Sequence, residues 1–132
     1  MIERELPGFI GNRLQFALLR EAWSLWASGA ASAEAIDACV RTSIGRRLGI
    51  TGPLESADLG GIATMEAFAR GLLPDLDTSP EPPPAVGETV ARGGVYDWSR
   101  RDADALRAAR TEELFRWLAR DSEQGRDRGG EA

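Results

Sequence analysis

The chain has 132 residues, of which 42% are hydrophobic and 28% charged, a composition typical of a soluble folded domain rather than a disordered segment. Its 16 basic residues are all arginine, and 21 acidic residues bring the formal net charge to -5. An acidic surface argues against nucleic acid or an anionic membrane as a partner. With no histidine and one cysteine, histidine-based metal sites, catalytic triads and internal disulfides are excluded.

At this length the chain fits one domain with a single hydrophobic core, but not a nucleotide-binding domain and a helical domain together. The longest apolar stretch is interrupted by Arg13, Arg20 and Glu21, so no segment is predicted to span a bilayer. The N-terminus lacks the features of a signal peptide. We therefore expect a cytoplasmic, all-α domain of about five helices over residues 1–120, followed by a disordered polar tail over residues 121–132.

The first predicted helix spans residues 9–27 and is apolar on two sides. One stripe includes Ile10, Leu14, Leu18 and Ala22, and the other includes Phe16, Leu19, Trp23 and Trp26. Arg13, Arg20 and Ser24 form a narrow strip that is predicted to be solvated. We expect one apolar face to pack within the chain and the other to meet a partner. The alternative is the central helix of a small bundle.

The later helices are predicted in chain order from their apolar periodicity and their caps. After a C-cap at Gly29, a second helix is capped by Ser32 and ends near Ile44 or Arg47. A short helix begins at Pro53, and the next helix spans residues 62–73 and is ended by Pro74. One or two helical turns follow over residues 86–92, and the last helix spans residues 102–120 and is capped by Ser99 or Asp102. Residues 77–84 are rich in proline and predict an extended loop. Burial is expected for Cys39 and for the apolar face of the last helix, which includes Leu106, Leu114, Trp117 and Leu118.

Four motifs carry a family resemblance when they are taken together. They are PGFIGNRL at residues 7–14, GRR at 45–47, TGPLESADLGG at 51–61 and GVYDW at 94–98. In this order and spacing they resemble the C-terminal helical domain of the 3-hydroxyacyl-CoA dehydrogenase family, which includes 3-hydroxybutyryl-CoA dehydrogenases and lambda-crystallin-like proteins. The resemblance implies an intertwined homodimer that closes over an acyl-CoA or another small acyl substrate.

Family members join this helical domain to a Rossmann domain, which binds NAD and supplies a His-Glu catalytic pair. The sequence contains no GxGxxG motif and no histidine, so the chain alone is not a complete dehydrogenase and binds no cofactor by itself. The resemblance implies the substrate-binding and dimerisation half, with NAD brought by a separate Rossmann subunit for hydride transfer. A second hypothesis is a repurposed domain that binds or converts, for example cyclises, another small molecule without NAD. A third is a structural dimer module without a ligand.

Asn12 matches the family asparagine at the domain junction, which hydrogen-bonds the substrate oxygen or the catalytic histidine. An amide suits this role because it donates without titrating, although Asn12 could instead orient the start of its helix. Arg13 could pair with a phosphate or an acidic partner residue, or remain solvated. Glu55 and Asp58 fall in the segment that lines the cleft floor in the family, where two carboxylates could share acid-base work. Their alternative role is to cap a helix or hold an arginine.

The Tyr-Asp-Trp motif predicts a packed aromatic pair of Tyr96 and Trp98. Family members have a longer glycine-rich insertion before this motif, whereas residues 90–95 join the two parts directly in this chain. We expect this shortening to alter the rim of the substrate cleft.

Overall fold

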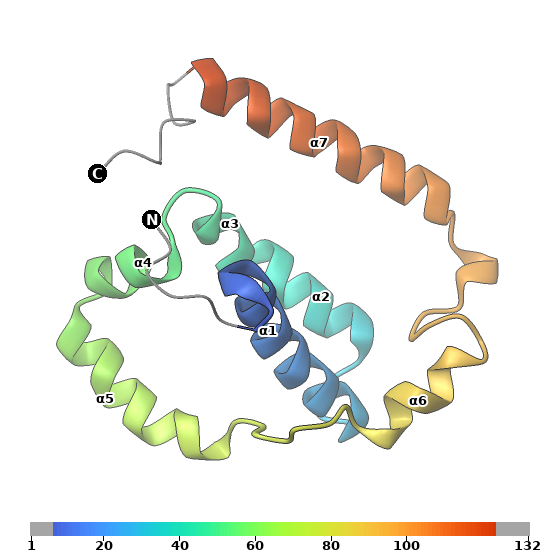
Figure 1. Cartoon of the computed structure of the whole chain (residues 1–132), viewed down its shortest axis with the longest axis horizontal. Coiled ribbons are helices and arrows are strands. Elements are labelled where there is room, and N and C mark those ends of the chain that lie inside the picture. Colours follow the sequence, from blue (N-terminus) through green and yellow to red (C-terminus); the bar gives the residue numbers. More distant parts are fainter. Residues whose placement is uncertain (1–6, 124–132) are drawn as a thin grey trace.

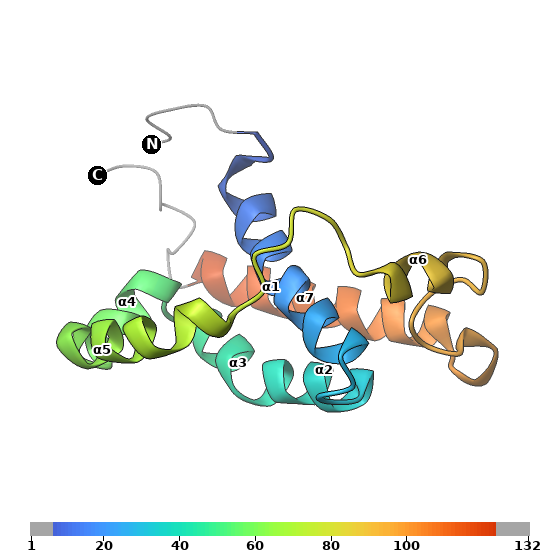
Figure 2. The ribbon, with the colours of Figure 1, turned by 90° about the horizontal axis from the view of Figure 1, so that it is seen from below.

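The computed structural model describes residues 7–123, and within this range the chain is helical with no strand. Its elements are α1 (Phe9–Ala27), α2 (Ala33–Thr42), α3 (Ile44–Leu48), α4 (Pro53–Leu59), α5 (Ile62–Leu72), α6 (Pro84–Val90), α7 (Ala103–Glu123) and the short 3-10 helices η1 (Leu73–Asp75) and η2 (Trp98–Arg100). This confirms the predicted all-α class. Helices α1 and α2 lie at the centre, and α5, α6 and α7 are arranged around them (Figure 1). The N-terminal half of α1 projects from the other helices (Figure 2).

Helix α1 ends at a glycine turn and α2 begins at a serine cap, as predicted. Gly29 has a φ of 75°, and its amide donates to the Trp26 carbonyl at 3.1 Å. The Ala30 amide donates to the Leu25 carbonyl at 3.0 Å, so carbonyls left without partners at the end of the helix are satisfied. The Ser32 hydroxyl accepts from an amide in the first turn of α2 at 3.2 Å. Local chemistry therefore fixes both ends of this connection.

The second predicted helix is wrong in one respect, because it breaks at Ser43 into α2 and α3. Ser43 has a φ of -115° and a ψ of -97°, and its hydroxyl donates to the Cys39 carbonyl. A side chain that bonds back to the preceding turn competes with the helical backbone. At Gly45 a Cβ would lie 2.8 Å from the Val40 carbonyl oxygen. The sharp break therefore requires a glycine in this position.

Two prolines set the ends of the next pair of helices, as predicted. Pro53 is the first residue of α4, where its missing amide and fixed φ are tolerated. Pro74 lies in η1, which directly follows α5, and proline cannot continue a helix without losing a backbone hydrogen bond. Between α4 and α5 the chain turns at Gly61, which has a φ of 87°.

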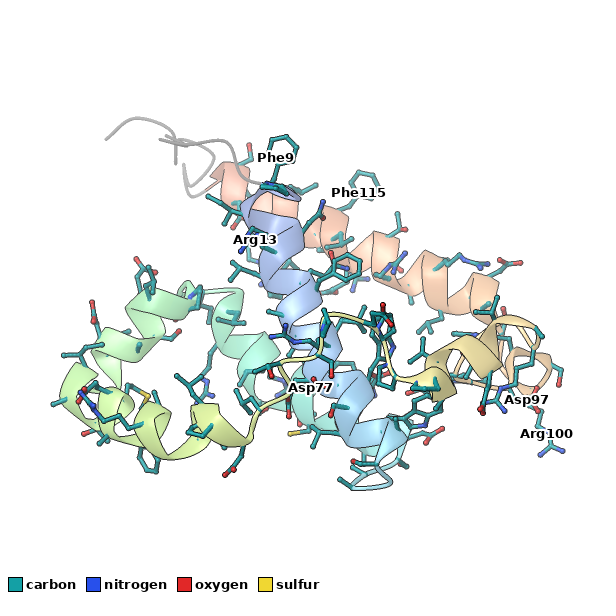
Figure 3. The ribbon with its side chains drawn as sticks, turned by 60° about the horizontal axis from the view of Figure 1, so that its bottom comes forward. Phe9, Arg13, Asp77, Asp97, Arg100 and Phe115 are labelled. Atoms are coloured by element: carbon teal, nitrogen blue, oxygen red, sulfur yellow. The ribbon has the colours of Figure 1, made fainter. Side chains whose placement is uncertain are left out.

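We call residues 76–83, between η1 and α6, the strap. The strap corresponds to the predicted proline-rich loop, except that Pro84 already begins α6, two residues before the predicted helical turns. It crosses α1 at Asp77 (Figure 3). The Asp77 amide donates to Glu21 Oε2 at 2.8 Å, and the Asp77 carboxylate accepts from the Ser79 amide at 2.6 Å. The strap is therefore tied to the central helix rather than free of it.

Helix α7 begins after Asp102, whose carboxylate accepts from the Ala105 amide at 2.8 Å. This confirms one of the two predicted caps. The helix runs past its predicted end at Arg120 and reaches Glu123, and the rest of the predicted polar tail lies outside the described residues. None of the helices in residues 7–123 is long and apolar enough to cross a membrane.

The predicted single core is wrong for one isolated chain. Within residues 7–123 no apolar side chain is buried, and Thr89, 4% exposed, is the buried residue. Cys39 is exposed, contrary to prediction. The apolar residues of α7 are also exposed, including Leu106 at 48% and Leu118 at 57%. The reason is that α7 lies apart from the central helices along most of its length (Figure 1), so its apolar face has no cover within the chain.

Candidate functional site

Asn12 and Arg13 lie in the first turns of α1, at the end that projects from the other helices (Figure 2). The helix starts from a left-handed turn in which Gly8 has a φ of 84° and Phe9 a φ of 51°. Glycine adopts such values readily, whereas a phenylalanine there is strained. A Cβ at Gly8 would lie 3.8 Å from Arg13 Cγ and 3.9 Å from Asn12 Cβ. Asn12 and Arg13 are both exposed at this end of the helix.

A cavity of about 480 Å³ lies between α1 and the strap, and we call it the strap cavity. Helix α1 contributes Arg13, Phe16, Arg20 and Trp23, and the strap contributes residues 79–82. The predicted solvated strip is wrong at Arg20, which is half-buried because the strap covers it. The sequence did not indicate that Arg20 would line a cavity. The available signal was the helical spacing that places two arginines and two aromatic residues on one face of α1.

The two predicted carboxylates lie on α4. Glu55 Oε2 accepts from the Gly52 amide at 3.0 Å, so Glu55 caps its own helix, which is close to the alternative role considered for it. Asp58 is exposed. Neither carboxylate lines the strap cavity or the larger groove between α1, α2 and α7. Their place in a substrate site therefore stays a prediction.

Tyr96 and Trp98 form the predicted aromatic pair, with ring centroids 5.9 Å apart in an edge-to-face arrangement. The Arg101 guanidinium lies 3.9 Å from the Tyr96 ring centroid in a cation–π contact. The Tyr96 hydroxyl donates to Asp37 Oδ2 at 2.7 Å. Burial, followed by the hydrogen bond to Asp37, raises the pKa of Tyr96 above its ordinary value of 10.0. The cluster fastens the segment before α7 to α2.

The shortened segment before the Tyr-Asp-Trp motif forms a compact turn. The Gly94 amide donates to the Thr89 carbonyl at 3.0 Å, and Gly93 and Gly94 have φ values of 86° and 141°. The Thr89 hydroxyl donates to the Val86 carbonyl at 2.7 Å, which explains why a polar residue is tolerated at this buried position. This turn stands where the family resemblance implies a longer insertion.

A larger cavity of about 990 Å³ lies between α1, α2 and α7, and we call it the central groove. Its apolar wall includes Leu18, Leu19, Ile36, Val40 and Leu106. Leu18 is 45% exposed, so the groove presents apolar side chains to solvent. The central groove and the strap cavity lie on different faces of α1. The predicted division into two apolar stripes is wrong at Leu19, which lines the groove together with Leu18.

The described residues do not fit NAD. A Rossmann site needs a glycine-rich turn between a strand and a helix, whereas Gly60 and Gly61 lie between two helices and Gly93 and Gly94 follow α6. Residues 7–123 also contain no group of three or more histidine, cysteine, aspartate or glutamate side chains placed to hold a metal ion.

Comparison with known proteins identifies the family. Residues 8–100 match the family model described as the C-terminal domain of 3-hydroxyacyl-CoA dehydrogenase. The chain belongs to the 3-hydroxyacyl-CoA dehydrogenase family. The family resemblance carried by the four sequence motifs is thus confirmed, and the helical architecture agrees with it.

Individual members of this family show similarity over most of the chain. The chain is 29% identical over 122 residues to the 5-formyl-3-hydroxy-2-methylpyridine 4-carboxylate 5-dehydrogenase of Mesorhizobium japonicum, covering 86% of this chain and 40% of the relative. It is 33% identical over 105 residues to the lambda-crystallin homolog of Homo sapiens, covering 80% of this chain and 30% of the relative. A solved structure also matches the chain; it is described as a 5-formyl-3-hydroxy-2-methylpyridine 4-carboxylic acid 5-dehydrogenase, an NAD+ dependent dismutase. The two structures agree with a TM-score of 0.82 and 28% sequence identity. The match covers 94% of this chain and 42% of that chain.

The chain spans less than half the length of each of these relatives. The activity, substrates and partners of the complete relatives are therefore not properties of this chain by similarity alone. The same relatives give no support to the hypothesis of a repurposed domain that works without NAD.

Proposed function

We propose that the chain is the substrate-binding and dimerisation half of an NAD-dependent 3-hydroxyacyl-CoA dehydrogenase. The observation that carries the proposal is the exposed Asn12 at the projecting end of α1, in a chain that matches the family's C-terminal domain over residues 8–100. An exposed amide at a projecting end is available to a second domain and to a ligand held between the two. The ligand class is an acyl-CoA or another small acyl compound, as in fatty acid metabolism.

In this proposal Asn12 contacts the reacting end of the substrate. Its amide N–H donates to the substrate oxygen and keeps its neutral charge near neutral pH. Arg13, the next residue, binds an anionic part of the substrate. Glu55 and Asp58 belong to the floor of the acyl site, and the bond from Gly52 to Glu55 supports a positioning role for Glu55 rather than acid-base work.

We place NAD and the catalytic base on a separate Rossmann subunit. The 132-residue sequence contains no histidine, and residues 7–123 offer no nucleotide site. In this proposal the base that accepts the hydroxyl proton and the nicotinamide approach Asn12 from that Rossmann subunit. We further propose a cytoplasmic location for the chain.

We also propose that two copies of the chain pair through the central groove. Within residues 7–123 no apolar side chain is buried, and Leu18 and Leu106 in the wall of the groove are 45% and 48% exposed. Obligate homodimers bury apolar surface of this kind. Apolar residues with no cover within the described part of the chain supply the surface that such a dimer would bury.

Reconstitution tests the proposed function. The chain is mixed with a family Rossmann subunit, NAD and 3-hydroxybutyryl-CoA, and NADH formation is followed by absorbance. We expect turnover only in the mixture, and a fall in kcat of about a hundred-fold for Asn12→Ala if its donor acts on the reacting oxygen. Glu88→Gln, an exposed change on α6, is the matched control. Absence of both a complex and turnover would contradict the proposal.

A further inference from the structure

Arg20 lines the strap cavity, and one of its hydrogen-bond donors has no partner among the described residues. Arg20 Nε is buried and has no hydrogen-bond partner among the described residues. A buried donor without a partner is costly, because it has lost water and gained nothing in return. In arginine the Nε edge presents two parallel N–H donors that match the two oxygens of a carboxylate.

The charges around the strap cavity favour an anion with a single negative charge. Arg13 and Arg20 both line the cavity, and neither takes part in an ion pair within residues 7–123. The nearby Asp77 carboxylate accepts from the Ser79 amide; its pKa is lowered by the hydrogen bonds from Ser79 and also by the charge of Arg20. Glu81 also lines the cavity. These two acids would repel a doubly charged phosphate more strongly than a carboxylate.

The remaining lining of the strap cavity is apolar except for Ser79. Phe16 and Trp23 face it from α1, and Pro80 and Pro82 face it from the strap. Trp23 is half-buried, so its ring is held rather than free. Aromatic rings and prolines offer flat surfaces to an apolar or aromatic body. A volume of about 480 Å³ is within the range of small-molecule sites.

We propose that the strap cavity binds a small organic monocarboxylate with an apolar, preferably aromatic, body. Arg20 donates two hydrogen bonds to the carboxylate, and Arg13 adds a second positive charge. The body of the ligand lies between Trp23 and the prolines of the strap. The proposal shares Arg13 with the proposed dehydrogenase function but does not depend on it, because the site is formed by this chain alone.

Calorimetric titration of the complete chain tests the ligand class. The probes are benzoate, butyrate and inorganic phosphate, with benzamide as the neutral counterpart of benzoate. We expect benzoate to bind more tightly than butyrate, and benzamide and phosphate to bind much more weakly than either. Benzamide binding as tightly as benzoate would overturn the role of Arg20, and phosphate binding more tightly would overturn the assignment to a monocarboxylate.

Three arginine variants test the location of the site. Arg20→Gln should weaken benzoate binding by about ten-fold or more, since a charged hydrogen-bonded pair is lost. Arg20→Lys keeps the charge but loses the paired donors, and should also weaken binding. Arg120→Gln makes the same charge change on α7, outside the cavity, and should leave binding unchanged. Equal weakening by Arg20→Gln and Arg120→Gln, with native circular dichroism in both, would overturn the site. These titrations use the chain without a Rossmann subunit. Their result is therefore independent of whether dehydrogenase activity can be reconstituted.

Discussion

The Tyr96 hydroxyl donates to Asp37 Oδ2 at 2.7 Å, across 59 positions of the sequence. Asp37 lies on α2, and Tyr96 lies in the segment that leads to α7. Asp37 also lines the central groove together with Trp98, the edge-to-face partner of Tyr96. This hydrogen bond therefore helps to set where α7 starts relative to α2, and with it one end of the groove.

The titration of Tyr96 reports directly on this contact, because Tyr96 is the single tyrosine of the chain. Burial and the bond to Asp37 raise its pKa above 10.0 in the folded state. The proton is held more tightly when the chain is folded, so this contribution to stability is complete below the ordinary pKa and is lost as pH rises through the folded-state pKa. An ultraviolet titration of tyrosinate should show a midpoint above 10.0 in folded protein and the ordinary value in denaturant.

Asp37→Asn is the matched variant for this titration. It removes the negative charge and weakens the acceptor while the side chain keeps its size. The midpoint should move down toward the ordinary tyrosine pKa, and the free energy of unfolding should fall by about 1 kcal/mol. An unchanged midpoint would contradict the contact between the two residues.

Gly49 lies at the end of α3 against the indole ring of Trp117 on α7, and a Cβ at this position would overlap the ring. We expect Gly49→Ala to displace the ring and to lower the free energy of unfolding by about 1 kcal/mol. The cost is small because Trp117 is 38% exposed and can rotate. Thermal unfolding and tryptophan fluorescence measure the two effects.

A second readout and a control accompany the Gly49 variant. The Trp117 indole donates to Glu113 at 2.8 Å, and this bond is the main cause of the lowered pKa of Glu113. That pKa, measured by NMR, should rise in Gly49→Ala. At Gly71, inside α5, a Cβ would meet open space. Gly71→Ala should therefore raise stability by about 0.5–1 kcal/mol, and a similar gain at Gly49 would show that α7 does not contact α3.

The hydrogen bond from the Asp77 amide to Glu21 predicts that the Glu21 carboxylate holds the strap against α1. Glu21→Ala should remove the acceptor and lower the free energy of unfolding by about 1–2 kcal/mol, whereas Glu21→Gln keeps a neutral acceptor and should lose less. Hydrogen exchange at the Asp77 amide should speed up in the same order. Equal exchange rates in both variants and the parent chain would show that the strap is held by other contacts.

The parts of the fold that rest on local chemistry could be predicted from the sequence. Gly29, Ser32 and Pro53 each act within a few residues of their own position, and the structure places helix ends at all three. Burial at Cys39 or Leu118 could not be predicted in the same way. Periodicity shows that a face is apolar, but whether it is covered depends on distant elements and on other chains.

In the candidate site, too, features set by local sequence could be predicted, and features set by distant segments could not. Asn12 could be proposed from its motif, since the flanking residues identify the family. The sequence of α1 predicts a solvated position for Arg20, because nothing in the helix itself indicates that another segment covers it. The strap that buries it comes from residues 76–83, far along the chain, and no local pattern indicates which helix a proline-rich loop will cross.

The central groove predicts that a charge in its wall prevents pairing of two copies. Leu18 lines the groove and is 45% exposed in one chain, and the proposed second copy would cover it. Leu18→Arg would place a charge without a partner in that interface, which is unfavourable. We expect the variant to sediment as a monomer and to unfold at a lower temperature, because one chain buries no apolar side chain within residues 7–123.

Glu88→Arg puts the same side chain on α6, outside the groove, and should remain a dimer. A parent chain that sediments as a monomer with the thermal stability of Leu18→Arg would contradict the pairing.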